Sequence, residues 1–365
     1  MNRLVIIGNG FDLSLGLKTS YKDFLFHFIK KNLIEFLDSD EYGKHVTFYT
    51  DIGNVHELKN NKLIKLRIPE HKSINSILTD IEDYDTYNDL SEYLIENKFL
   101  SYKIDLLNII HQKSVNDNWI DIEISYYDKL IEFIKSRKPI RNYNEKFGYL
   151  KLELIKYLNS VDKLITDIHS NRLERLFDYH SNFLEGLFQS NNKDSVKVNE
   201  IMVLNFNYTF SLERINKIIP INKSLEINHI HGNLHDKDSI IFGFGDEHDK
   251  DYNLLKSGRS NEQFRYTKKS YYSLYPNKKK LNSFINSDKY EVYILGHSCG
   301  ISDRTLLNNI FENDLCKSIR IFHKNKNSSQ DYLNKIHEIG KYFDDTKGKI
   351  LPFDKNDTIH PLKTE

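Results

Sequence analysis

Two patterns of hydrophobic positions divide the chain. Near its start and again after residue 200, short runs such as residues 3–7 and 201–204 are almost wholly apolar. Such runs indicate strands of a parallel sheet that is covered on both faces. Between residues 74 and 190, apolar residues recur three and four positions apart, which predicts helices. The sequence therefore predicts an α/β fold: one Rossmann-like parallel sheet interrupted by a large helical insertion.

The strands of this sheet can be assigned from the apolar runs. We expect them at residues 3–7, 201–204, 227–230, 239–242, 291–295 and 318–322. Further strands are possible at residues 47–50 and 63–68. A helix is expected to follow the first strand, with Thr19 or Ser20 as its N-cap.

The same runs predict the domain organisation. We assign residues 1–35 and 199–350 to a discontinuous nucleotide-binding domain. Residues 36–198 form the mostly helical insertion, and residues 247–289 form a smaller insertion rich in Lys and Tyr. Residues 351–365 are predicted to be a tail.

Composition narrows the classes of function. The 365 residues include 52 Lys and Arg and 52 Asp and Glu, so no overall field favours nucleic acid or an acidic membrane. No apolar run approaches the length of a membrane helix, and the chain opens directly into a strand. Cys299 and Cys316 cannot build a four-cysteine zinc site. These observations predict a reduced, cytoplasmic protein without a membrane partner.

Glycine-containing or polar clusters follow five of the predicted strands. They occupy residues 8–12, 205–209, 231–233, 243–246 and 296–298. In open α/β sheets, ligands bind in the crevice beyond the carboxyl ends of the strands. We therefore expect these clusters to converge on one binding site.

The first cluster has the pattern of a phosphate-binding turn. Gly8, Gly10 and Gly16 are spaced as G-x-G-x5-G, and Asn9 lies in the same turn. Glycines between a strand and a helix allow backbone N–H groups to approach a phosphate. The spacing is not that of a Walker loop, and a tight turn alone would explain it equally well. Asp12 either caps the turn or binds a ribose hydroxyl.

Asparagine and histidine follow two further strands. Asn205 and Asn207 come after a buried strand, and their amides can bind ribose or water. His231 stands at a strand end beside a glycine, which favours a catalytic or ligand-binding imidazole. His229 is predicted to be structural and His235 solvated. No metal site is predicted, because these histidines lack an acidic or cysteine partner at convincing spacing.

The last cluster has two interpretations. Gly296, Ser298 and Asp303 could bind a phosphate or a ribose. The alternative is a serine-hydrolase elbow, since residues 296–300 match G-x-S-x-G after a strand, with an acid and histidines downstream. Against the elbow, its strand comes late in the sheet and leaves little chain for the strands that carry the acid and the histidine.

Several segments resemble the bacterial AbiH family of phage abortive-infection proteins. They are LVIIGNGFDLSLGLKTSYKDFL, NFNYT, HIHGNL, FGFGD and ILGHSCGISD, which together reach across nearly the whole chain. Trp119, Asp121 and Glu123 also resemble a Trp-x-Asp-x-Glu element of that family. The two carboxylates form a functional pair, or the segment is a helix entry with a buried tryptophan.

The same segments are similar, more remotely, to the sirtuin-like NAD-binding fold. The similarity is carried by the three glycines of the first turn, by Asn207 and by His231. The sequence departs from that pattern at Asp12, Lys18 and Thr209, and it has no cysteine zinc module. The resemblance implies NAD as ligand or substrate rather than protein deacylation.

Together these features suggest an antiphage protein that binds a nucleotide, most simply NAD, and hydrolyses its nicotinamide–ribose bond. Asn207 would orient water and ribose, and His231 would be the general base. The alternative is a non-catalytic, nucleotide-gated sensor or protein-binding module, and a phage-encoded trigger or a homo-oligomer is compatible with either. A metal-dependent nuclease would need an acidic cluster, for which the candidates are Asp121, Glu123, Asp246, Glu247 and Asp249.

Overall fold

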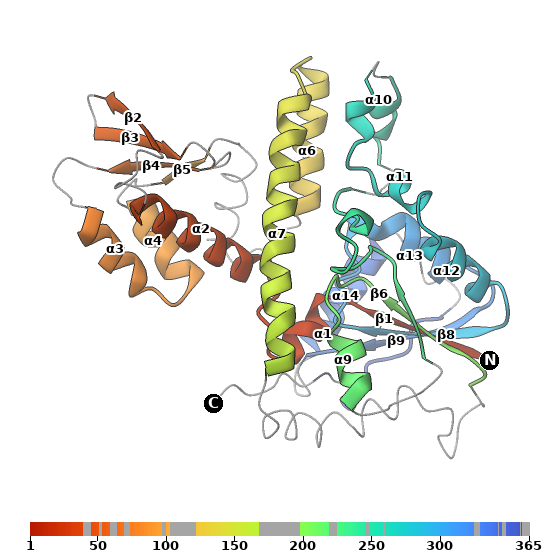
Figure 1. Cartoon of the computed structure of the whole chain (residues 1–365). Coiled ribbons are helices and arrows are strands. Elements are labelled where there is room, and N and C mark those ends of the chain that lie inside the picture. Colours follow the sequence, from red (N-terminus) through yellow and green to blue (C-terminus); the bar gives the residue numbers. More distant parts are fainter. Residues whose placement is uncertain are drawn as a thin grey trace. The chain divides into compact units, whose positions relative to one another are not determined.

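A computed structural model describes most of the chain (Figure 1). The described residues are 1–38, 45–50, 53–58, 64–68, 74–96, 100–102, 122–167, 198–218, 225–244, 249–257, 260–324, 329–341, 343–344, 348–357 and 359. They form two compact units. Unit 1 comprises Met1–Thr19, Leu158–Tyr252 and Tyr266–Glu365, and unit 2 comprises Ser20–Tyr157 and Asn253–Arg265.

The core of unit 1 is a five-stranded, all-parallel sheet in the order β7-β6-β1-β8-β9. The strands are β1 (Asn2–Ile7), β6 (Ile201–Asn205), β7 (Glu226–His229), β8 (Tyr290–Leu295) and β9 (Cys316–Phe322). β1 lies at the centre, where Val5 pairs with Val203 on one side and with Tyr293 on the other. The predicted α/β architecture with a parallel sheet is confirmed.

The strand order determines where the chain changes direction across the sheet. Numbered within the sheet in chain order, the strands lie as 3-2-1-4-5, so the order reverses between β1 and β8. Because all five strands are parallel, their carboxyl ends share one edge. The segments that follow residues 7, 205, 229, 295 and 322 therefore start at the same edge of unit 1.

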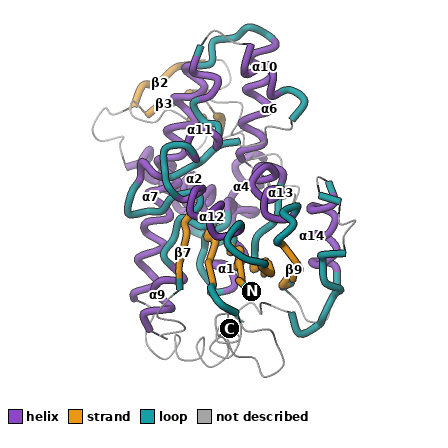
Figure 2. The backbone as a smooth tube through the Cα atoms, turned by 90° about the vertical axis from the view of Figure 1, so that its right-hand side faces the viewer, coloured by secondary structure: helices purple, strands orange, loops and turns teal. Residues whose placement is uncertain are grey.

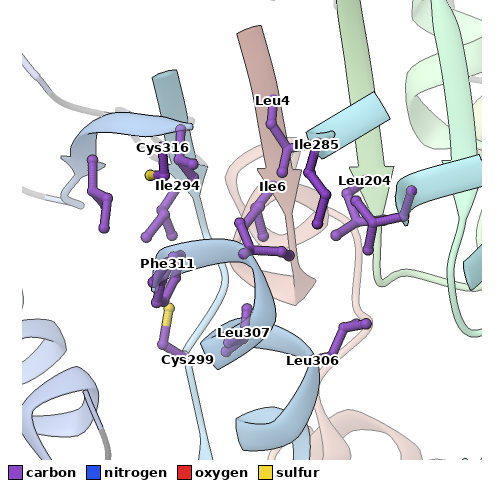
Figure 3. Packing of buried hydrophobic residues seen from close by; sticks show 14 of the residues in the cluster. Leu4, Ile6, Leu204, Ile285, Ile294, Cys299, Leu306, Leu307, Phe311 and Cys316 are labelled. Carbon is purple, nitrogen blue, oxygen red and sulfur yellow. The ribbon is translucent and has the colours of Figure 1, made fainter. Parts of the chain in front are cut away.

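Alternate residues of β1 enter different cores, which explains why its sequence is wholly apolar. Leu4 and Ile6 pack into one cluster of buried side chains, and Val5 and Ile7 pack into another. Figure 3 shows the first cluster, in which Leu307 and other residues of α13 (Arg304–Phe311) lie among side chains of the sheet. A strand buried on both faces needs hydrophobic side chains in both directions.

The helices of unit 1 connect and cover these strands (Figure 2). In the described part of the chain they are α1 (Asn9–Ser14), α9 (Ser211–Ile218), α11 (Lys268–Tyr272), α12 (Asn277–Ile285), α13 and α14 (Gln330–Gly340), with the end of α7 (Arg141–Asp167) and the short 3-10 helices η2 (Lys237–Ser239) and η4 (Ile301–Asp303). The second core cluster includes Leu212 and Ile215 of α9, whereas the first includes residues of α12, α13 and α14. The two clusters thus lie on opposite faces of the sheet.

The strand predicted at residues 239–242 is wrong. Residues 237–239 form η2, and Asp236 caps this helix by accepting hydrogen bonds from two backbone N–H groups. Ile240, Ile241 and Phe242 are buried without joining the sheet. The Ile241 N–H donates to the carbonyl oxygen of His231 at 2.8 Å. An apolar run shows that a segment is buried, but it does not distinguish a strand from an irregular loop.

Unit 2 contains its own four-stranded antiparallel sheet, with strands β2 (His45–Thr50), β3 (Gly53–Leu58), β4 (Ile64–Ile68) and β5 (Leu100–Tyr102). β2 and β4 match the possible strands in the sequence, whereas β3 and β5 were not predicted. The unit also contains α2 (Tyr21–Asp38), α3 (Ile74–Glu82), α4 (Tyr87–Glu96), α6 (Ile122–Lys135), α10 (Tyr252–Ser257), η3 (Asn261–Phe264) and most of α7 (Arg141–Asp167). Most residues of these elements are helical, and the small antiparallel sheet adds strands that the prediction of a mostly helical insertion did not include.

The start of α2 confirms one of the two predicted caps. Ser20 Oγ accepts a hydrogen bond from the Asp23 N–H, and the Ser20 N–H donates to the Asp23 carboxylate, each at 3.1 Å. This reciprocal pair is a capping box, which satisfies two N–H groups that a helix start leaves free. In the described part of the chain, no helix is long and apolar enough to span a membrane.

Candidate functional site

The first glycine turn packs against the turn that follows β8. The Gly10 N–H donates to the Gly296 carbonyl oxygen at 2.8 Å, and the Gly8 N–H donates to the Leu295 carbonyl oxygen at 3.1 Å. A Cβ atom on Gly10 would lie 2.7 Å from the Gly296 Cα. The predicted phosphate-facing amides of Gly8 and Gly10 are therefore occupied by protein carbonyls, and backbone packing by itself requires glycine at position 10.

The remaining residues of this turn also have local roles. Gly16 follows α1 with a φ of 78°, a left-handed conformation that commonly ends helices. Asn9 Oδ1 accepts a hydrogen bond from the Thr19 hydroxyl at 2.6 Å. Gly296 also has a positive φ, of 67°. The Asn9–Thr19 hydrogen bond stabilises the segment after β1. The bonds from the Gly8 and Gly10 N–H groups join that segment to the β8 turn at the carboxyl edge of the sheet.

Asp12 is the centre of a buried cluster of neutral donors, which we call the Asp12 cluster. The carboxylate accepts hydrogen bonds from Thr209 Oγ1 at 2.5 Å, from Ser211 Oγ at 2.6 Å and from Asn207 Nδ2 at 3.0 Å. The residue is 1% exposed. Burial raises the pKa of Asp12 to about 6, although the three donors oppose the rise. The cluster joins the β1 turn to the segment after β6.

Asn205 and Asn207 have different roles. Asn205 Oδ1 accepts the Asn207 backbone N–H at 2.9 Å, so the first asparagine shapes the turn that follows β6. Asn207 Nδ2 donates to the Gly8 carbonyl oxygen at 3.1 Å as well as to Asp12. Among the described residues, Asn207 Oδ1 has no donor. Both amide hydrogens of Asn207 are thus engaged, and its oxygen is left to accept a hydrogen bond from a ligand or water.

Asp303 is the centre of a second cluster, the Asp303 cluster. Its Oδ1 lies 2.8 Å from Lys268 Nζ and 3.2 Å from His231 Nε2, and its Oδ2 lies 3.6 Å from His297 Nε2. The Lys268 side chain is 1% exposed and that of Asp303 is 10% exposed. Burial alone would raise the pKa of Asp303, but the Lys268 ammonium and the two imidazoles outweigh it and hold the pKa well below its usual value.

The hydrogen-bond network indicates which ring nitrogens carry protons. His297 Nδ1 accepts the backbone N–H of Cys299 at 3.0 Å, so its proton is on Nε2, which faces Asp303. An ionised Asp303 can only accept, so the proton of neutral His231 belongs on Nε2. The lone pair of His231 is then on Nδ1, which has no hydrogen-bond partner among the described residues.

His231 is held in a buried environment. Burial and the neighbouring Lys268 ammonium lower the pKa of His231, although Asp303 opposes the shift. Its Nε2 also lies 3.0 Å from the hydroxyl oxygen of Tyr272. The Phe206 ring packs edge-on against the imidazole, with the ring centroids 5.0 Å apart. His231 is therefore a neutral, oriented imidazole at neutral pH.

The Asp303 cluster folds over the edge of the sheet. β7 and β8 are separated by β6 and β1, so their ends lie roughly 14 Å apart at the usual spacing between strands. Yet His231, which follows β7, contacts Asp303, which follows β8. Phe206, which follows β6, packs against both His231 and His297. The segments after β6, β7 and β8 thus converge over the carboxyl edge, as predicted for the clusters that follow them. The cluster at residues 243–246 was expected to follow a fourth such strand, but residues 239–242 do not join the sheet.

The turn after β8 differs from a serine-hydrolase elbow. In such an elbow the nucleophile occupies the strained position of the turn. Here Cys299, rather than Ser298, has the positive φ, of 56°. Burial raises the pKa of the Cys299 thiol to about 12, which makes it a poor nucleophile. Ser298 is only half-buried, and among the described residues no histidine contact identifies it as a nucleophile.

His229 and His235 do not form a metal site. His229 Nε2 contacts Glu213 Oε1 at 2.5 Å, and its Nδ1 donates to the Asn207 carbonyl oxygen at 3.2 Å, as suits a structural residue. The His235 ring stacks on Phe210 with centroids 3.9 Å apart. Among the described residues, no group of three His, Cys, Asp or Glu side chains could hold a metal ion.

The structure describes only some of the acidic residues that a nuclease site would need. Trp119, Asp121, Asp246 and Glu247 lie outside the described residues. Glu123 is buried in α6, within unit 2, whereas Asp249 belongs to unit 1.

Sequence reasoning missed two members of the Asp303 cluster, Lys268 and His297, and also Tyr272, which contacts His231. Lys268 and Tyr272 lie in residues 247–289, which were predicted to be a smaller insertion and from which no site residue was named. Of these residues, only His297 could have been predicted as a site residue, because it stands between Gly296 and Ser298 directly after a predicted strand. Asp303 was predicted to bind a ligand, but in the structure its oxygens face a lysine and two histidines.

Comparison with known proteins identifies the family of the chain. No curated protein matches the chain significantly. The model of the family described as bacteriophage abortive infection AbiH matches residues 4–324, a range that includes both the Asp12 cluster and the Asp303 cluster. The chain belongs to the bacteriophage abortive infection AbiH family.

Proposed function

We propose that this AbiH chain acts in abortive infection by binding NAD at the carboxyl edge of unit 1 and hydrolysing the nicotinamide–ribose bond. The family supports the role in phage defence. The strand order 3-2-1-4-5 supports a Rossmann-like sheet, which binds dinucleotides beyond the strand ends where the order reverses. In this sheet the order reverses between β1 and β8, beside the segments that carry both clusters.

The observation that carries the proposal is the contact between His231 Nε2 and Asp303 Oδ1 at 3.2 Å. The Nε2–H of His231 points to the ionised Asp303, so Nδ1 is an unprotonated base of fixed orientation. A lowered pKa keeps the ring neutral, and therefore competent as a base, at physiological pH. This pairing of a buried carboxylate with an imidazole is the usual way in which proteins orient a general base.

The reaction needs neither a metal nor a redox partner. The bond between the ribose C1′ and the nicotinamide nitrogen breaks, and its electron pair neutralises the pyridinium. Water oxygen bonds to C1′, and one water proton passes to His231 Nδ1. The products are nicotinamide, ADP-ribose and a proton. Because the leaving group departs as a neutral molecule, positioning of water and ribose supplies most of the catalysis.

Asn207 is the proposed positioning group. Its amide hydrogens are held by Gly8 and Asp12, which leaves Oδ1 to accept a hydrogen bond from the water or from a ribose hydroxyl. The Asp12 cluster thus fixes the orientation of Asn207. The phosphates require other donors, because the Gly8 and Gly10 amides are already bonded.

The test is to incubate the purified full chain with NAD and to measure free nicotinamide by chromatography. His231→Ala should slow turnover by roughly 10²–10⁴-fold with little change in NAD affinity. His337→Ala, at an exposed position on α14, is the matched control and should be unaffected. Turnover should be level above pH 6.5, because the pKa of His231 is lowered.

Two outcomes of this assay would contradict the proposal. If wild type binds NAD without releasing nicotinamide, the site is that of a sensor. If both histidine variants release nicotinamide at the wild-type rate, His231 is not the base.

A further inference from the structure

His229 is the last residue of β7, and both nitrogens of its ring face oxygen atoms. Nε2 lies 2.5 Å from Glu213 Oε1, and Nδ1 lies 3.2 Å from the Asn207 carbonyl oxygen. The residue is 7% exposed. Because a carbonyl oxygen only accepts hydrogen bonds, Nδ1 must carry a proton for its contact to be favourable.

The contact with Glu213 agrees with a proton on Nδ1. Glu213 lies in the first turn of α9, where the helix dipole stabilises a negative charge. An ionised Glu213 accepts a hydrogen bond from the Nε2–H of an imidazolium, and a protonated Glu213 donates to Nε2 of a neutral ring. In both cases Nδ1 keeps its proton. The pair therefore directs one N–H group at Asn207.

The second carboxylate oxygen of Glu213 also bears on the role of the pair. Glu213 Oε2 is buried and has no hydrogen-bond partner among the described residues. A buried acceptor without a partner lowers stability. A glutamate that only stabilised the start of α9 would act equally well from solvent. We attribute the burial of Glu213 to its contact with His229.

His229 is connected to both groups of the proposed reaction. Its carbonyl oxygen accepts the Gly232 N–H at 3.0 Å, which closes the tight turn that contains His231. The Asn277 side chain donates to the same oxygen at 2.6 Å. The main chain of His229 thus fixes the turn of the proposed base, while its ring contacts the backbone of Asn207.

The bond from His229 adds to three others that hold Asn207. The Asn207 N–H donates to Asn205 Oδ1 at 2.9 Å. The side-chain amide of Asn207 donates to Gly8 and Asp12. His229 supplies the contact to the carbonyl oxygen. Partners on the β1 turn, on β6 and on β7 together give Asn207 Oδ1 a defined position.

We infer that His229 is a positioning residue of the proposed NAD site, which acts by holding the Asn207 carbonyl oxygen through Nδ1–H. The inference rests on the proposed function for the identity of the reaction. His229 is not the base, because protein oxygens engage both of its ring nitrogens. Without the Nδ1 bond the peptide after β6 can rotate, and Asn207 Oδ1 then loses its alignment with the water that attacks ribose C1′.

Two amide variants separate the two ring contacts of His229. In His229→Asn the new Nδ2 takes the place of the imidazole Nδ1 and can donate to the Asn207 carbonyl oxygen. In His229→Gln the new Nε2 takes the place of the imidazole Nε2 and can contact only Glu213. Both variants remove the imidazole from the same buried position, so each is a control for the other. His337→Gln, at an exposed position on α14, is the control for a histidine outside the site.

We expect His229→Gln to lower kcat for nicotinamide release from NAD by roughly 10²-fold, the typical effect of misplacing a group that orients the reactants. KM should change little, since the aligned water matters in the transition state rather than in binding. His229→Asn should keep kcat close to that of wild type. Circular dichroism establishes that each full-length variant is folded under the assay conditions.

A second measurement does not depend on turnover. Long-range proton–nitrogen correlation spectra of histidine-labelled protein report which ring nitrogens carry protons, and the His229 signals are those lost in His229→Asn. We expect a protonated Nδ1 at neutral pH. In asparagine-labelled protein, the side-chain amide signals of Asn207, assigned from Asn207→Ala, should shift in His229→Gln and stay in place in His229→Asn.

The inference is overturned if His229 Nδ1 carries no proton, or if the two variants change kcat and the Asn207 signals alike. If His229→Gln does not fold, the Nδ1 signal of wild type decides. The proposed function fails separately, when wild type releases no nicotinamide. The Nδ1 proton and the Asn207 signals then decide alone whether His229 positions Asn207.

Discussion

Asp12 and Asp303 are both buried carboxylates at the carboxyl edge of the same sheet, yet their pKa values shift in opposite directions. The donors to Asp12 are two hydroxyls and an amide, and its pKa rises to about 6. The neighbours of Asp303 are a lysine and two histidines, and its pKa falls well below the usual value. Burial is therefore not what distinguishes them. The charge of the surrounding donors decides whether a buried carboxylate stays ionised.

The opposite pKa shifts of Asp303 and Asp12 suit two different roles. Asp303 keeps its charge and can fix the proton of His231 on Nε2. Asp12 is protonated over part of the physiological range, which suits a group that holds loops together rather than one that stabilises a charge. Three substitutions test this contrast.

The largest effect is expected from Asp303→Asn. The change leaves the Lys268 ammonium buried without its counter-ion, which typically costs 3–5 kcal/mol, so we expect a loss of about 4 kcal/mol of unfolding free energy. Urea denaturation followed by circular dichroism at pH 7.5 measures it. Adding Lys268→Met should recover much of the loss, because the unpaired charge is then removed. A loss below about 1 kcal/mol for Asp303→Asn would contradict the ionised pair.

Removing the charge of Asp12 is expected to have a smaller effect than Asp303→Asn, and one of opposite sign: a gain of unfolding free energy at neutral pH. Between pH 4 and 6 the folded protein binds a proton at Asp12 that the unfolded chain does not, so stability is present at low pH and is lost as pH rises towards 6. A pKa raised from 3.8 to about 6 corresponds to about 3 kcal/mol.

Asp12→Asn keeps the shape of the side chain and removes this titration. Relative to wild type, the variant should gain stability as pH rises from 4 to 7, measured by urea denaturation at each pH. Asp314→Asn, at an exposed site, is the control and should show no such trend. An Asp12→Asn variant that loses stability as pH rises would reverse the interpretation of the Asp12 cluster.

The smallest effect is expected from Thr209→Val, which removes one donor to Asp12. We expect a loss of about 1 kcal/mol at pH 7.5, and less at pH 5, because a hydrogen bond to an ionised carboxylate is stronger than one to a neutral carboxyl. Urea denaturation at pH 7.5 and at pH 5 measures the two losses of unfolding free energy. An equal loss at the two pH values would mean that Asp12 does not change its protonation state between them.

The parallel sheet could be predicted from the sequence because β1 is buried on both faces. Leu4 and Ile6 fill one core and Val5 and Ile7 fill the other, so the strand carries an unbroken apolar signal. The segment 239–242 gives the same signal without being a strand. Hydrophobicity reports burial, and only the pairing partners, which lie far away in the sequence, determine whether a buried segment joins a sheet.

The candidate site was predictable in position but not in its contacts. Asn207 and His231 follow strands, so their common edge could be foreseen. Lys268 could not, because a buried lysine in a lysine-rich segment has no distinguishing sequence pattern. The partners of Asp12 had a weak signal, since Asn207, Thr209 and Ser211 occupy alternate positions between aromatic residues.

The central position of β1 has a consequence for biosynthesis. Ile6 pairs with Ile294, which the ribosome adds 288 residues later. At typical elongation rates of 5–20 residues per second, the delay is roughly 15–60 seconds. During that time an apolar strand has no partner on its β8 side, although β6 becomes available earlier. A nascent chain of this kind has an unsatisfied strand edge until β8 has been made, so it needs protection from aggregation for most of its synthesis.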